Sequence, residues 1–223
     1  MKNKIAAACT LAGLSLAGTA GAQIAVTGSL GTTGVGAHLT VPVMPQLNAR
    51  FGLNALRYNY EGSTTDLEYD YKLKLRTVDA LLDYYPQGTG FRLTGGIVFN
   101  GNKIDAVGQP TPGGTYTLNG RTYSVATAGT LDGRIDFRNI APYLGIGWGS
   151  AAGKDKGWKV SGDLGVMLQG SPRTSLANVG CTAPAPLCSQ LAADVAAENL
   201  RLNDEADDFK VFPVLRIGAS YSF

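Results

Sequence analysis

Apolar and polar residues alternate with a period of two in seven stretches of this chain. In the segment 214–223 one face carries Leu215, Ile217 and Phe223, while the other face carries Arg216. A period of two is typical of a β-strand with one apolar and one polar face. The other six stretches are 32–43, 47–56, 77–85, 90–100, 139–148 and 158–168. The pattern predicts an all-β chain and leaves open which solvent meets the apolar faces.

The connections between these stretches alternate between short and long. The short segments are 43–46, 86–90 and 150–157, and the longer ones lie near 61–66, 105–135 and 171–208. Bacterial outer-membrane barrels have short periplasmic turns and long outside loops. If the short segments face the periplasm, an upward strand must precede residue 32, and residues 24–30 are the candidate. The predicted fold is then an eight-stranded antiparallel up-and-down transmembrane β-barrel.

The N-terminal segment 1–22 predicts export. Two lysines precede an apolar run and then Ala20-Gly21-Ala22, which is typical of a secretory signal peptide cleaved before Gln23. An uncleaved membrane anchor and a lipoprotein site at Cys9 are the weaker alternatives. The mature barrel domain would be 23–223, in which no apolar run approaches the ~18–20 residues that a membrane helix needs. A membrane strand needs only ~9–11 residues.

Composition and charge narrow the class of protein. The chain has 223 residues with 30 Gly and only 16% charged residues, which suits strands and turns better than helices. Cleavage of the signal peptide would lower Lys+Arg from 19 to 17, against 17 Asp+Glu, so the mature chain is formally neutral. No basic surplus argues for nucleic acid as a partner.

Aromatic residues gather beside the predicted turns, as they do at the two interfaces of a membrane. The lower set is Tyr84, Tyr85, Phe91, Trp148, Trp158, Tyr221 and Phe223, and the upper set is Tyr58, Tyr60, Phe99 and Phe137. A soluble β-sandwich would bury its apolar faces and has no reason to sort Trp and Tyr beside one set of turns. The sequence therefore favours localisation in the cell outer membrane.

Three segments resemble a proteobacterial outer-membrane β-barrel family without a settled activity. They read APYLGIGWG, DKGWKVSGDLGVMLQGSP and DDFKVFPVLRIGASYSF. Over residues 31 to 223 the chain looks like the small eight-stranded barrels of the OmpA transmembrane-domain and OmpW type. The resemblance implies that Tyr221 and Phe223 form the signal read by the barrel-assembly machinery. It also implies an outer-membrane lipid environment with lipopolysaccharide.

The polar faces of the predicted strands carry charges that would lie in the barrel interior. They are Arg50, Asp79, Asp83, Arg92, Lys159, Asp163 and Arg216, with His38 nearby. Eight strands enclose a space just wide enough for side chains. Unpaired charges there would cost several kcal/mol each. One interpretation is an ion-pair plug that closes the interior; the other is a lining for small polar solutes. Inward glycines would leave room for solutes or let large neighbours pack.

Local signals predict structure outside the membrane. Asn119-Gly120 is a strong two-residue hairpin signal. The strand 67–76 changes phase near Thr77, which predicts a β-bulge or a shift at the membrane edge. If its basic residues face outward, they would meet lipopolysaccharide phosphates, although a solvated strand face is the plainer interpretation. These residues are Lys72, Lys74 and Arg76.

The last long loop predicts a disulfide and a short helix. Cys181 and Cys188 have six residues between them, and an even pair in an exported chain favours a local disulfide over a metal site. Apolar residues then recur near helical spacing, at Leu187, Leu191, Val195 and Leu202. The acidic residues that follow, 204–208, have no calcium-loop spacing and predict a solvated charge run.

Signals for an enzyme are weak. The single histidine, His38, has Thr40 two residues on, where a lipid-modifying His-Ser pair would need a serine. We therefore expect a non-enzymatic protein with no catalytic, cofactor-binding or metal-binding residues. A structural or surface-interaction role with a charge-plugged interior is the first hypothesis. A narrow channel for small polar or hydrophobic solutes is the alternative, and a lipid-modifying enzyme is a distant one.

Overall fold

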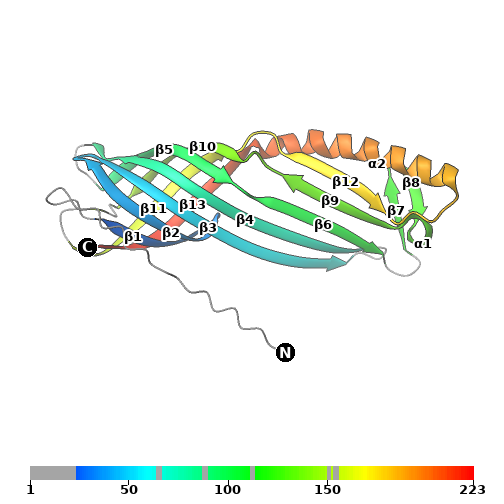
Figure 1. The fold of residues 1–223 in the computed structure, drawn as a ribbon, viewed down its shortest axis with the longest axis horizontal. Helices are drawn as coiled ribbons and strands as arrows, with labels where there is room; N and C mark the ends of the chain where they lie inside the picture. The colour runs from blue at the N-terminus through cyan, green and yellow to red at the C-terminus, as the bar shows by residue number, and fades with distance from the viewer. Residues whose placement is uncertain (1–23, 64–66, 87–89, 111–113, 150–151, 153–155) are drawn as a thin grey trace, which may run out of the picture.

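The computed structural model describes residues 24–63, 67–86, 90–110, 114–149, 152 and 156–223. The predicted signal peptide, residues 1–22, lies outside this part of the chain. Figure 1 shows an elongated molecule, with the C-terminus at one end and helix α2 extending toward the other.

Eight strands follow the stretches that the alternation predicts. They are β1 Ala25–Gly31, β2 Gly34–Met44, β3 Leu47–Ser63, β4 Leu67–Tyr84, β5 Phe91–Asn100, β10 Ile140–Trp148, β11 Gly157–Leu168 and β13 Val211–Ser222. Their order is β4-β3-β2-β1-β13-β11-β10-β5, all antiparallel, and β5 also pairs with β4 through Thr77–Tyr84. Each of these eight strands therefore has a hydrogen-bonded partner on both sides. We call this part of the molecule the ring.

The strand count of eight is too low, because the described residues contain thirteen strands. The additional ones are β6 Lys103–Pro110, β7 Thr115–Leu118, β8 Arg121–Ser124, β9 Thr130–Asp136 and β12 Arg173–Val179. Three of them continue a ring strand after a short break, and β3 and β4 run on beside them. At one break the Asn102 side-chain oxygen accepts a hydrogen bond from the Arg76 backbone N–H, in place of the strand ladder, at 2.9 Å.

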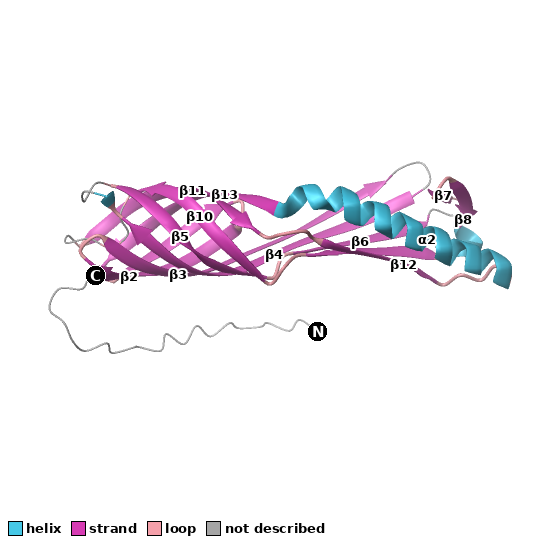
Figure 2. Cartoon of the chain, turned by 90° about the horizontal axis from the view of Figure 1, so that it is seen from above, coloured by secondary structure: helices cyan, strands magenta, loops and turns pink. Residues whose placement is uncertain are grey.

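The continued strands form an extension above the ring, in the order β12-β9-β6-β4-β3. Helix α2, Ala185–Ala206, lies along this sheet in Figure 2 and is followed by the 3₁₀ helix η2, Asp207–Lys210. The helix has 22 residues, so the prediction of a short helix is wrong in length. The hairpin β7–β8 and the short helix α1, Val125–Ala128, close the far tip. None of the described helices is long and apolar enough to cross a membrane.

The ring has its apolar side chains outside and its charges inside, which inverts the pattern of soluble proteins. Val35 is 62% exposed and Trp158 is 76% exposed, whereas Asp79 and Arg216 are 1% and 2% exposed. The alternation predicted these two faces correctly. An apolar cluster is buried inside the upper part of the ring, and it consists of Leu81, Val98, Ala141, Tyr143, Met167 and Val214.

The predicted bulge or shift near Thr77 is wrong. Strands β3 and β4 pair without a register shift from Leu47 to Ser63. Leu73 and Leu75 lie on the same face as Thr77, because all of them are an even number of residues apart. The pattern changes because this inner face meets a charged interior below Thr77 and an apolar cavity above it.

Only part of the upper aromatic set faces outward, as an aromatic girdle at a membrane interface would. Tyr58 pairs with Leu73 and Tyr60 pairs with Tyr71. Directly paired residues share a face of the sheet, so Tyr58 and Tyr60 point to the inner side of the extension. Phe137 lines the inner cavity, and Phe99 alone of the four faces outward with half of its surface exposed.

Candidate functional site: the charged interior

Arg50 on β3 is the centre of the first group of interior charges. Its guanidinium donates to Asp163 on β11 at 2.9 and 3.1 Å and to Asp83 on β4 at 3.0 Å. Arg92 on β5 donates to the same Asp163 at 2.7 Å and lies 3.7 Å from Asp83. Thr94 also donates to Asp83, at 2.6 Å. Two arginines and two aspartates from four strands therefore form one compact, neutral group.

Asp79 on β4 is the centre of the second group. The Arg216 guanidinium of β13 lies 2.9 Å from its carboxylate, and the His38 ring of β2 lies 3.4 Å away. Asn54 donates to the same carboxylate at 3.0 Å. The guanidinium of Arg216 also lies 5.7 Å from the centre of the Tyr143 ring, within the range of a cation–π contact.

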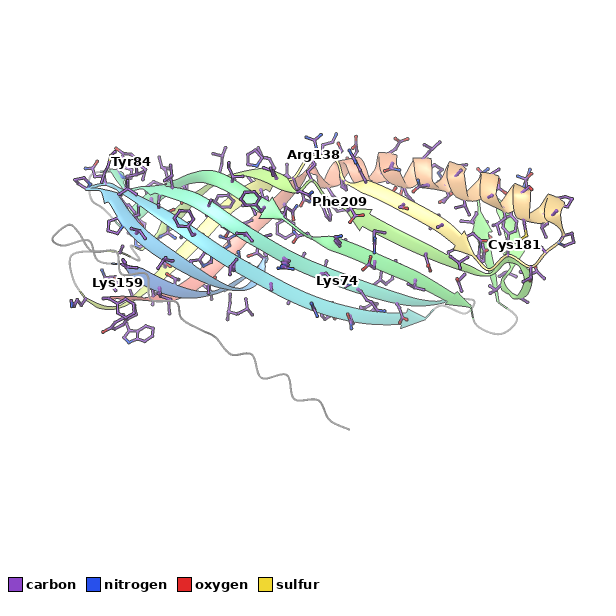
Figure 3. All side chains as sticks on the ribbon, viewed as in Figure 1. Lys74, Tyr84, Arg138, Lys159, Cys181 and Phe209 are labelled. Atoms are coloured by element: carbon purple, nitrogen blue, oxygen red, sulfur yellow. A yellow bond between two sulfur atoms is a disulfide. The ribbon has the colours of Figure 1, made fainter. Side chains whose placement is uncertain are left out.

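The structure brings seven of the eight predicted interior residues together and leaves one out. Lys159 lies on the same face of β11 as Asp163, but four residues nearer to the beginning of the strand. Figure 3 shows it at the end of the ring away from α2. It is partly exposed and forms no ion pair within the described residues. The strand period gives the face of a residue and does not give its neighbours across the interior.

Tyr143 is an interior residue whose importance the sequence analysis missed. It is fully buried. A Cβ atom at Gly165 would lie 2.4 Å from its hydroxyl oxygen, and one at Gly145 would lie 2.7 Å from it. The two glycines face each other on β10 and β11, so the ring of Tyr143 covers them. A large inward residue that is followed at two residues by glycine was the available signal.

Little free space remains among the interior charges. The cavity among the charged groups measures about 10 Å³ and is lined by His38, Arg50, Asp83, Arg92, Asp163 and Arg216, among others. A space of ~10–15 Å³ is the least that accommodates a water molecule. Side chains therefore fill the ring at this level.

A much larger cavity lies above the ring. It measures about 660 Å³ and lies between the inner face of β4, β6, β9 and β12 and the C-terminal half of α2. Its lining is mainly apolar and includes Leu73, Ile104, Ile135, Leu176, Leu202 and Phe212. Phe212 also packs against the apolar cluster inside the ring. The cavity is therefore separated from the interior charges by an apolar layer.

The remaining candidate groups are a possible metal site, the His38–Thr40 pair, the two cysteines and the C-terminal aromatic residues. The described residues contain no group of three metal-ligating side chains. His38 and Thr40 are both buried on the inner face of β2.

The predicted disulfide between Cys181 and Cys188 is confirmed, with Cα atoms 6.0 Å apart. At the other end of the molecule the Tyr221 ring lies 5.1 Å from that of Phe223 and 5.5 Å from that of Trp158.

Comparisons with known proteins place the fold. No protein-family model matches the chain, and no curated protein matches it. The crystal structure of Acinetobacter baumannii CarO2 matches with a TM-score of 0.57 and 19% identity, over 90% of this chain and 98% of that one. Acinetobacter baumannii CarO matches with 0.56 and 22% identity, over 89% and 97%. A major outer membrane protein from Thermus thermophilus matches with 0.45 and 15% identity, over 91% and 99%. The chain has an outer-membrane β-barrel-like fold.

Proposed function

We propose that this chain is an integral outer-membrane protein whose eight ring strands form a closed barrel with a plugged interior. Its role is structural or lies in surface interaction, without catalysis. The short turns would face the periplasm, and the extension with α2 would stand outside the cell. The matching CarO folds support the barrel architecture, and the inverted faces of the ring support the membrane.

The apolar outer surface of the ring is the main support for a membrane location. Exposed apolar side chains cover the strands, and Leu39, Phe51, Leu93, Ile97, Leu144, Ile146 and Leu164 are among them. Soluble proteins rarely expose apolar surface on this scale. Hydrocarbon is the solvent that such a surface matches, while the polar backbone is satisfied by pairing on both sides of every ring strand.

One observation supports the closed interior. The interior charges form a neutral ion-pair network, and the free space among them measures about 10 Å³. Three arginines and three aspartates neutralise one another within 4 Å. The partners of each charge lie on different strands, so a solute would have to break several ion pairs at once. Removing one partner of a buried pair costs about 3–5 kcal/mol.

The test is conductance of the refolded mature chain in a planar bilayer, after its heat-modifiable gel mobility has shown a folded barrel. We expect no discrete current steps from the wild type. Removing both partners of one pair, in Asp79→Asn/Arg216→Met, keeps the interior neutral and should permit folding. That variant should remain silent or open small pores, whereas Lys159→Met should match the wild type. Reproducible wild-type steps would refute the plugged interior.

The cavity above the ring favours a second function, capture of hydrophobic solutes. Its volume of about 660 Å³ lies in the range of small-molecule sites, which are mainly apolar. The lining residue Gly133 offers a filling variant, because a Cβ atom there would have no neighbour nearer than 3.6 Å. Gly28, with no atom within 4 Å, offers a matched control on the outer face of β1.

The test uses an uncharged, environment-sensitive dye with the protein in lipid nanodiscs, which avoid detergent in the cavity. If solutes enter the cavity, Gly133→Leu should weaken dye binding and Gly28→Leu should not. Equal binding by the two variants would show that the dye partitions elsewhere.

A further inference from the structure

The outer face of the extension is ordered by charge along its strands. Residues directly paired in antiparallel strands share one face, so the pairings define rows across the sheet. At the upper edge of the ring one such row is entirely apolar and consists of Leu53, Val78, Phe99 and Ile140. All four side chains are exposed. This row marks the upper limit of the lipid-facing surface.

Four residues further along β3 and β4, the corresponding row consists of charged residues. It consists of Arg57, Lys74, Lys103, Asp136 and Arg173, each directly opposite the next across five strands. At about 3.4 Å per residue, this row lies ~14 Å beyond the apolar one. The next row contains Lys72, Asp105 and Arg134. Arg76 and Arg138 lie between the apolar row and the charged ones.

We call these eight cations the basic belt: Arg57, Lys72, Lys74, Arg76, Lys103, Arg134, Arg138 and Arg173. Figure 3 shows Lys74 on β4 and Arg138 near the beginning of β10. Beyond the belt the charge reverses, because the following row places Asp70 and Asp132 on either side of Val107. The cations are therefore collected in a band of neighbouring rows, two to six residues beyond the apolar row.

The two carboxylates within the belt do not neutralise it. Lys74 lies 2.8 Å and Arg134 lies 2.9 Å from Asp105, and Lys103 lies 3.6 Å from Asp136. The hydrogen bonds from Lys74 and Arg134 lower the pKa of Asp105, so the carboxylate of Asp105 stays ionised at neutral pH. Five cations form no ion pair within the described residues, and they are Arg57, Lys72, Arg76, Arg138 and Arg173.

The belt also places like charges against each other. Arg57 is directly opposite Lys74, and Lys74 is directly opposite Lys103. Like charges in directly opposed positions destabilise a sheet. An anion bound between them would relieve this repulsion.

One part of the belt surrounds a hollow of suitable size. Lys103, Asp136, Arg138 and Arg173 line a space of about 440 Å³ together with Asn100 and Asn102. The hollow lies where β5, β9 and β11 are interrupted at the upper edge of the ring. Guanidinium and ammonium groups are the natural donors to phosphate oxygens.

We propose that the basic belt binds the phosphate groups of lipopolysaccharide in the outer leaflet. The inference rests on the proposed function, because it needs the apolar row to face hydrocarbon. A neutral headgroup would leave the like charges unrelieved, and the acidic row above would repel a phosphate at any greater height. The belt thereby fixes the depth of the protein in the membrane.

The experiment compares lipid A that carries its phosphates with enzymatically dephosphorylated lipid A. Native mass spectrometry of the refolded barrel measures binding of each lipid to wild type, to Lys103→Gln/Arg173→Gln, and to the charge-matched control Lys156→Gln/Lys159→Gln. The wild type should prefer the phosphorylated lipid. A cation near a membrane surface contributes about a fivefold change in affinity, so the belt variant should lose ~25-fold and the control should not change.

The outcomes separate this inference from the proposed function. A chain that shows no heat-modifiable mobility and no insertion into bilayers would overturn both. A chain that inserts but binds both forms of lipid A equally would overturn the belt alone. Equal affinity for phosphatidylglycerol, at equal charge, would overturn lipopolysaccharide as the occupant.

Discussion

Two glycines inside the ring, Gly52 and Gly147, make room for large neighbours. A Cβ atom at Gly52 would lie 2.1 Å from the His38 ring, and one at Gly147 would lie 2.7 Å from the Arg92 Nε atom. Both neighbours belong to the ion-pair network. Gly and large polar residues therefore occupy facing positions, which is how a narrow interior accommodates arginine.

Gly52→Ala should destabilise the barrel through overpacking against His38. The ring of His38 is buried and lies between Ser29 and Asp79, at 3.3 and 3.4 Å, so it has little freedom to move. We expect a loss of about 1–3 kcal/mol in unfolding free energy, measured by urea titration in lipid vesicles. Gly28→Ala, which meets no atom within 4 Å, should leave the stability unchanged. Equal stability of the two variants would contradict this packing.

The inward face of each residue could be predicted from the sequence, but its partners could not. A period of two placed Arg50 and Asp163 inside, and they are 113 residues apart in the chain. Their contact depends on the order and stagger of strands around the ring, which alternation does not encode. The same limit explains Lys159. The sequence predicted its inward face correctly, but its position along β11 keeps it away from the ion-pair network.

Helix α2 packs differently in its two halves. Leu191 and Val195 are buried against the hairpin β7–β8 and helix α1. In this half Asp194 accepts hydrogen bonds from the Tyr123 hydroxyl and from Asn119 at 3.1 Å. The other half, near Leu202, borders the large cavity. The helix is therefore anchored at the tip by apolar packing, whereas near the ring it borders a cavity and is held to β12 by hydrogen bonds from Thr174 to Asn199 and Asn203.

The anchor should weaken in acid. The hydrogen bonds from Tyr123 and Asn119 lower the pKa of Asp194 below its usual value. A carboxylate with a lowered folded pKa stabilises fully above its unfolded pKa, near ~4, and stops stabilising as the pH falls through the folded value. The hydrogen-exchange protection factors of β7, β8 and the first half of α2, corrected for the intrinsic exchange rate at each pH, should fall below about pH 4. In Asp194→Asn this pH dependence should disappear; if it persists, another group is responsible.

Local turn chemistry and an extension of the sheet past the membrane were predictable, whereas the individual strands of the extension were not. Asn119 and Gly120 have φ values of 49° and 75°, which the hairpin between β7 and β8 requires. The strands β6, β9 and β12 escaped prediction because the apolar side of the extension faces inward, toward a helix, whereas that of the ring faces outward. A strand whose apolar side faces outward in the ring and inward in the extension gives no single periodic signal.

At the scale of the whole molecule, the tolerance of an exposed leucine to arginine should depend on whether it lies on the ring or on the extension. Leu144 lies mid-strand on β10 with 59% exposure, and Leu200 lies on α2 with 68% exposure. Leu144→Arg should cost about 2–4 kcal/mol, as an arginine at the bilayer midplane does. Leu200→Arg should be neutral, because water already meets this side chain. Refolding yield and urea stability in vesicles provide the comparison, and equal tolerance of the two variants would exclude the proposed membrane position.

The pairing of Asp163 with Arg216 directly across β11 and β13 has a consequence for misassembly. If β13 slipped by one residue, every side chain on it would change face. In the proposed membrane position, Ile217 would then point among carboxylates, and Arg216 would point into hydrocarbon. Each interior charge would thus penalise a wrong register twice, once by its absence from the network and once by its exposure to lipid. The ion-pair network that we propose as a plug would therefore also select the correct alignment of the strands.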